Sequence, residues 1–106
     1  MAKKYELSPA SRLDLIDIED ATFERFGIVQ ALLMNDAFVA AFEKLAENPG
    51  IGHLRKDLSP PGEEFFYWPV KNTFLIVYRV KAQAVEIVRV LHGRRHVEAL
   101  LKQSEE

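Results

Sequence analysis

Two helical patterns of apolar residues, joined by a single glycine, constrain the fold of this chain more than any other feature. Ser8 and Pro9 suit the N-cap and the first turn of a helix, and Gly27 suits the position just after its end. A second pattern, with apolar residues three and four apart, runs from Ile28 to Glu47, where an Asn-Pro-Gly sequence stops it. Because one residue links the two patterns, the sequence predicts a tight helix hairpin.

Apolar residues on one side of each predicted helix mark the face that we expect to pack on the rest of the protein. In the first helix they are Leu15, Ile16, Ile18, Phe23 and Phe26, together with Thr22. In the second they are Ile28, Ala31, Leu32, Phe38, Val39, Phe42, Leu45 and Ala46. We expect Phe23, Phe38 and Phe42 to lie in the core.

The remaining sequence predicts short strands. The expected strands are Lys3–Leu7, Glu64–Val70, Phe74–Lys81 and Val85–Leu91. Short turns between the last three indicate an antiparallel meander. Residues 51–62 are predicted to form a loop and residues 94–102 a short final helix. The predicted order, β-α-α-β-β-β-α, corresponds to a single two-layer α+β domain over residues 1–106.

Composition limits the classes of function. The chain has no cysteine, which excludes disulfides and thiol chemistry, and a net charge of −2, which argues against a general nucleic-acid binder. Residues 1–50 carry five basic and nine acidic side chains, whereas residues 51–102 carry nine basic and five acidic ones. Such asymmetry indicates either a directional surface or chance clustering. We expect no signal peptide and no membrane span, and therefore a cytoplasmic protein.

Motifs for cofactors and metals are absent from the sequence. It contains no glycine-rich phosphate loop and no GxSxG nucleophile motif. His92 and His96 have the four-residue spacing of metal ligands, but Gly93 interrupts any helix between them. We therefore expect neither a metal nor another cofactor.

Three residues near the C-terminal end could carry catalysis. Metal-independent RNA cleavage needs cations for the phosphorane and an acid or base, which Arg79, Arg89 and His92 could supply. Alternatively, the two arginines are structural. A two-residue turn at Ala82-Gln83 would place Arg79 opposite Glu86, as an exposed ion pair, and Arg89 opposite Ile76.

Four consecutive aromatic residues, Phe65 to Trp68, are the other candidate site. A strand directs alternate side chains to opposite faces, so two of the four must lie away from the main core. They form either a binding patch or a surface that the final helix covers.

Several segments together resemble the RelE/ParE superfamily of type II toxins. The segments that carry the resemblance are Tyr5 to Ala10, Glu24 to Gly27, Leu45 to Gly52, Trp68 to Val70, Val77 to Val80 and Val85 to Arg95. It extends over about residues 3–101 and is closer to the ParE branch.

The resemblance implies a toxin that a ParD-like antitoxin neutralises in a hetero-oligomer, with a role in plasmid stabilisation. ParE-like members are associated with DNA gyrase, so no catalytic residues of this chain's own are expected. RelE-like members cleave mRNA on the ribosome, and others are non-toxic binding modules; both remain alternatives. No membrane binding and no sequence-specific nucleic-acid binding are expected. The residues predicted to contact the antitoxin are Arg79, Arg89, Arg94, Arg95, Phe65, Tyr67 and Trp68.

Overall fold

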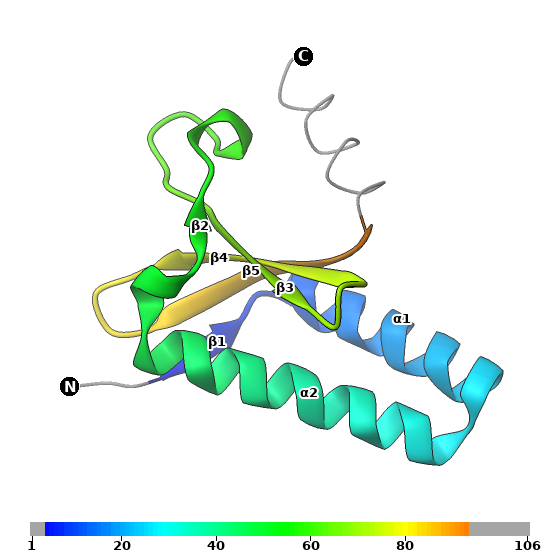
Figure 1. Cartoon of the computed structure of the whole chain (residues 1–106). Coiled ribbons are helices and arrows are strands. Elements are labelled where there is room, and N and C mark those ends of the chain that lie inside the picture. The colour runs from blue at the N-terminus through cyan, green and yellow to red at the C-terminus, as the bar shows by residue number, and fades with distance from the viewer. Residues whose placement is uncertain (1–3, 94–106) are drawn as a thin grey trace.

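A helix hairpin lies along one face of a five-stranded sheet in the computed structural model, which describes residues 4–93 (Figure 1). The main elements are β1 (Tyr5–Leu7), α1 (Pro9–Phe26), α2 (Ile28–Glu47), β2 (His53–Leu54), β3 (Phe66–Val70), β4 (Phe74–Val80) and β5 (Val85–His92). The strand order is β1-β5-β4-β3-β2, with β1 parallel to β5 and the other neighbours antiparallel. The predicted α+β class, the hairpin and the meander are thus confirmed.

Local signals at both ends of α1 explain the hairpin. The side-chain oxygen of Ser8 accepts a hydrogen bond from the backbone N–H of Ser11 at 3.0 Å, as an N-cap does. At the other end, Gly27 has a φ of 88°, and its N–H donates to the carbonyl of Phe23 at 2.9 Å. Glycine adopts this left-handed conformation without a steric penalty, so the chain can turn directly into α2.

Residues 51–62 are more structured than the loop that the sequence predicts. They include β2 and a 3-10 turn at Lys56–Leu58, and a further 3-10 turn, Pro49–Ile51, leads into them. Only two residues of β2 pair with β3, and so short a strand has little sequence pattern to reveal it. The predicted final helix, residues 94–102, lies outside the described residues.

The main core fills the space between the hairpin and the sheet. Its buried residues are Phe38, Phe42, Leu45, Val70, Phe74, Ile76, Tyr78, Val85, Ile87 and Val90. The hydroxyl of Tyr78 donates to the carbonyl of Pro49 at 2.7 Å and accepts from the N–H of Gly52 at 3.0 Å. The prediction that Phe23 is a core residue is wrong: it is 53% exposed.

A bulge in β5 changes the predicted register. Arg79 pairs with Glu86 as predicted, but Val77 pairs with Arg89 and Ile76 with Val90. The pairing of Arg89 with Ile76 is therefore wrong. Between Tyr78–Ile87 and Val77–Arg89, β5 contains one extra residue, Val88, which shifts every later pair by one position.

Candidate functional site

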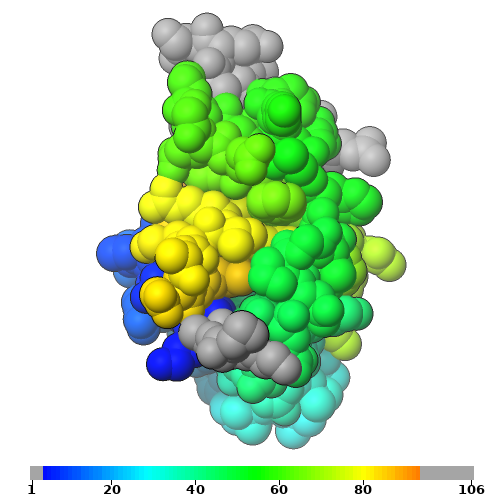
Figure 2. Space-filling model, turned by 90° about the vertical axis from the view of Figure 1, so that its left-hand side faces the viewer, coloured from blue at the N-terminus to red at the C-terminus, as the bar shows by residue number. Residues whose placement is uncertain are grey.

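Two carboxylates hold the guanidinium of Arg79. Its Nε donates to Glu86 Oε1 at 2.6 Å, and its Nη1 donates to Glu63 Oε1. The hydrogen bond that Arg79 donates to Glu86 is the largest cause of the raised pKa of Arg79. Figure 2 looks at this end of the sheet, where the green segment near residue 60 lies close to the yellow turn between β4 and β5. Arg79 of β4 therefore links the segment around Glu63 to β5 through Glu86, and these two carboxylates neutralise its charge.

Arg89 has a partner that the sequence did not reveal. Its Nε and Nη2 donate to Asp14 Oδ2 and Oδ1 at 2.8 and 2.9 Å, and this interaction is the main cause of the raised pKa of Arg89. The same carboxylate accepts the backbone N–H of Val90 at 2.9 Å. Asp14 lies 75 residues before Arg89, so only the packing of α1 beside β5 brings the two together.

His92 lies far from Arg79. It ends β5, six positions beyond Glu86, the residue that pairs with Arg79. A rise of 3.3 Å per residue separates the two backbones by about 20 Å. The imidazole packs edge-on against Phe74, with ring centroids 5.1 Å apart. The fold thus does not bring Arg79 and His92 to one phosphate. Arg94 and Arg95 lie outside the described residues.

The four aromatic residues divide between the two faces of the sheet. Phe66 and Trp68 pack against the main core, and Trp68 also lies under Lys44, whose Nζ is 5.3 Å from the ring centroid. On the opposite face, Tyr67 is buried in a second cluster with Leu58, Val77 and Leu91, and Phe65 packs against its edge. Burial raises the pKa of Tyr67 to about 12. In the described residues these side chains therefore fill two cores and do not form one exposed patch.

The closed end of the hairpin exposes the large apolar side chains instead. We call it the hairpin tip and define it by six residues that are each more than half exposed: Phe23, Phe26, Ile28, Val29, Leu32 and Leu33. The tip projects past the sheet in Figure 1, so nothing in the described fold covers it. A helix can bury one stripe, but the adjacent pairs Ile28-Val29 and Leu32-Leu33 place apolar residues on several faces. These pairs were the signal in the sequence that would have revealed an exposed surface.

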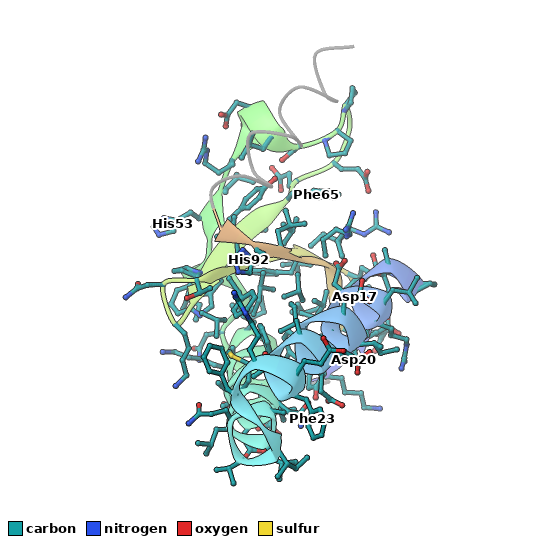
Figure 3. All side chains as sticks on the ribbon, turned by 90° about the vertical axis from the view of Figure 1, so that its right-hand side faces the viewer. Asp17, Asp20, Phe23, His53, Phe65 and His92 are labelled. Carbon is teal, nitrogen blue, oxygen red and sulfur yellow. The ribbon has the colours of Figure 1, made fainter. Side chains whose placement is uncertain are left out.

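A groove of about 460 Å³ lies next to the hairpin tip. It is lined by Ile18, Ala21, Thr22, Arg25, Phe26, Gln30, Leu33, Met34, Lys71, Thr73, Phe74 and His92. Phe26 and Leu33 belong to both surfaces, so the tip and the groove are continuous. Figure 3 shows Asp17, Asp20 and Phe23 in turn along α1 and His92 on β5.

The described residues provide no metal site, because residues 4–93 contain no group of three or more histidine, aspartate or glutamate side chains arranged to hold an ion. Within the same range, neither helix has the length and apolar character needed to cross a membrane. In the described residues, the candidate binding surfaces are the groove and the exposed apolar residues of the hairpin tip.

Comparison with known families agrees with this organisation. Residues 5–97 match the model of the family described as the ParE toxin of the type II toxin–antitoxin system parDE. The chain belongs to the ParE toxin family. It is 31% identical over 99 residues to toxin ParE1 of Mycobacterium tuberculosis, covering 92% of this chain and 97% of that protein. It is 32% identical to toxin ParE1 of Caulobacter vibrioides, covering 93% and 98%.

The fold is also similar to that of a solved structure. A chain of the chromosomal ParDE system of P. aeruginosa superimposes with a TM-score of 0.71 at 21% sequence identity, covering 86% of this chain and 96% of that one. This likeness shows the shared fold, and the family match over residues 5–97 shows a ParE toxin of a ParDE toxin–antitoxin system, which implies an antitoxin partner.

Proposed function

We propose that this ParE toxin acts by binding and inhibiting DNA gyrase in the cytoplasm, and that a ParD-like antitoxin neutralises it in a hetero-oligomeric complex. The chain then works as a binding protein and not as a nuclease. The observation that carries the proposal is that Arg79 and Arg89, the cations that a nuclease would use, are bound by carboxylates of the same chain.

Metal-independent RNA cleavage needs a cation and an acid or base at the same phosphodiester. In the described residues, Arg79 is held by Glu63 and Glu86, and Arg89 is held by Asp14. Asp14 binds Arg89 with both carboxylate oxygens, and two separate glutamates bind Arg79, so carboxylates already occupy the guanidinium groups that would bind phosphate. His92 lies about 20 Å along the sheet from Arg79. This arrangement favours the ParE type of activity over the RelE type.

A direct test measures both activities with the purified chain. We expect it to inhibit supercoiling by gyrase and to leave mRNA intact in a ribosome translation assay. His92→Ala should inhibit gyrase as well as the unchanged chain does. Cleavage of ribosome-bound mRNA that disappears in Arg79→Ala, Arg89→Ala and His92→Ala would instead establish a nuclease. Unimpaired growth of cells that express the chain would show instead that the protein is a non-toxic binding module.

A further inference from the structure

The side of α1 that points away from the core carries a row of exposed apolar side chains. Leu13 is 64% exposed, Ile16 54% and Phe23 53%. Residues two apart on a helix point about 200° away from each other. Leu15 and Ile18 pack on the main core, so Leu13 and Ile16 point away from it. Phe23, seven residues after Ile16, continues the row to the hairpin tip.

This row is a different surface from the groove beside the hairpin tip. The described residues that line the groove include Ile18 and Thr22 of α1, but not Leu13, Ile16 or Phe23. The helix is therefore apolar on two opposite sides, of which only one packs on the described fold. We call the exposed side, with Leu13, Ile16, Phe23 and the carboxylates beside them, the outer face of α1.

Three of these carboxylates are neighbours on the helix. Asp17, Asp20 and Glu24 follow one another at spacings of three and four residues, and Figure 3 shows Asp17 and Asp20 in turn along α1. Asp20 comes four residues after Ile16 and three before Phe23, so it lies between them. In the described part of the chain, none of the three carboxylates takes part in an ion pair.

The fold gains nothing from this arrangement. Like charges three and four residues apart destabilise a helix, and Glu24 lies near the C-terminal end of α1, where the helix dipole disfavours negative charge. Departures from local preference of this kind are expected at functional sites. At roughly 100 Å² for each half-exposed large side chain, the row presents about 300 Å² of apolar surface, enough for a functional patch. An apolar centre with a charged rim is the usual anatomy of a protein interface.

Charge selects the chemistry of the partner. From residue 13 to residue 24 the sequence contains no lysine or arginine, so the middle of the row is bordered by acidic side chains alone. The outer face therefore attracts a segment in which basic side chains accompany apolar ones, and repels an acidic segment. Enzymes that bind DNA neutralise its phosphates with lysine and arginine, so gyrase offers basic surfaces of matching charge. An acidic antitoxin segment, which the arginines expected to contact the antitoxin would select, does not match.

We propose that the outer face of α1 is the surface with which this toxin binds gyrase, and that its occupant is a gyrase segment in which lysine and arginine side chains flank apolar ones. This inference rests on the proposed function, since it takes gyrase as the target. It assigns binding to a face of the hairpin that neither the groove nor the sheet contributes to.

Binding of the fluorophore-labelled chain to purified gyrase, together with inhibition of supercoiling, tests the surface. Ile16→Gln and Asp20→Lys should each weaken binding at least about tenfold and raise the half-inhibitory concentration in proportion. Val80→Gln is the matched control, because Val80 is 50% exposed but lies on β4, and its affinity should stay within about threefold. Replacing Asp17, Asp20 and Glu24 by their amides should weaken binding and flatten its dependence on salt.

Cross-linking identifies the occupant. The chain contains no cysteine, so Ile16→Cys can carry a photoactivatable cross-linker at one position. We expect it to react with a gyrase peptide that contains lysine or arginine beside apolar residues, as identified by mass spectrometry. Val80→Cys, labelled in the same way, should not react with that peptide. Capture of an acidic peptide, or equal reaction from both positions, would contradict the proposed occupant.

Other outcomes separate this inference from the proposed function. Gyrase inhibition that Ile16→Gln and Asp20→Lys leave unchanged would refute the outer face and keep gyrase as the target. Loss of antitoxin binding in these variants, with gyrase binding intact, would assign the face to the antitoxin. A dimer of the free chain that Ile16→Gln dissociates, again with gyrase binding intact, would assign it to a second copy. No binding of gyrase by the unchanged chain would contradict the proposed function, and this inference with it.

Discussion

Among the ion pairs of residues 4–93, the one whose loss should be most damaging is that of Asp14, tested by its replacement with alanine. The carboxylate accepts three hydrogen bonds, two from Arg89 and one from the backbone N–H of Val90, and the Asp14 side chain is only 14% exposed. The Arg89 side chain is 44% exposed, so water can hydrogen-bond its guanidinium once Asp14 is gone. Loss of the ion pair should therefore cost about 1 kcal/mol or less. The Val90 amide is partly buried, and leaving it without an acceptor costs about 1–3 kcal/mol.

The expected loss for Asp14→Ala is therefore about 1–4 kcal/mol of unfolding free energy. For a domain of this size each kcal/mol corresponds to a fall in Tm of about 4–8 °C. Urea unfolding of the purified chain, followed by Trp68 fluorescence, measures it. Arg89→Ala should cost about 1 kcal/mol or less, because the Val90 amide keeps its acceptor. Asp17→Ala, an exposed change on the same helix, should lie within about 0.5 kcal/mol of the unchanged chain.

Equal destabilisation by Arg89→Ala and Asp14→Ala would contradict this prediction. The ion pair would then dominate, and the cap on the Val90 amide would contribute little. A loss for Asp14→Ala no larger than that for Asp17→Ala would also contradict it, because the contact between α1 and the bulged part of β5 would then not stabilise the fold.

Three further changes test other parts of the structure. Gly52→Ala should destabilise the chain by about 1–3 kcal/mol in urea unfolding, because its Cβ would clash with the Tyr78 hydroxyl; unchanged stability would mean that the loop moves freely. Tyr67 has a folded pKa of about 12 against about 10 unfolded, so stability should be complete below pH 10 and fall as pH rises towards 12. Absorbance at alkaline pH should show this late titration and lose it in Tyr67→Phe. Arg79→Ala should cost only about 1 kcal/mol, less at high salt, since its side chain is 37% exposed; a larger loss in thermal unfolding would contradict this.

The hairpin could be predicted because its signals are local. Ser8, Pro9 and Gly27 determine the ends of α1 through hydrogen bonds and backbone conformations within a few residues. The strands of the meander could be predicted for the same reason, from alternation and short turns. By contrast, a single inserted residue such as Val88 leaves no trace in the apolar pattern, although it changes the partner of Arg89.

The site was harder to predict because it depends on contacts between distant parts of the chain. Asp14 and Arg89 meet only when α1 packs beside β5, and nothing in either segment selects the other. Periodicity placed Phe23 on the inner face of α1, but it cannot say how far the sheet extends beneath the helix. The structure answers that question: the sheet ends before the tip begins (Figure 1).

The pairing of β1 with β5 has a consequence for how the chain acquires its fold. Tyr5 pairs with Val85, so the first strand made has its only sheet neighbour in the last strand described. During synthesis, β1 and the cap of α1 must wait until β5 emerges before the Ser8 hydroxyl finds the Val88 carbonyl, 80 residues away. Contacts of such long range slow folding, because the loop between them must close first. A chain that stops before Val85 would lack β5, the strand that packs beside α1 and pairs with β1, so we expect an incomplete copy to be degraded rather than active.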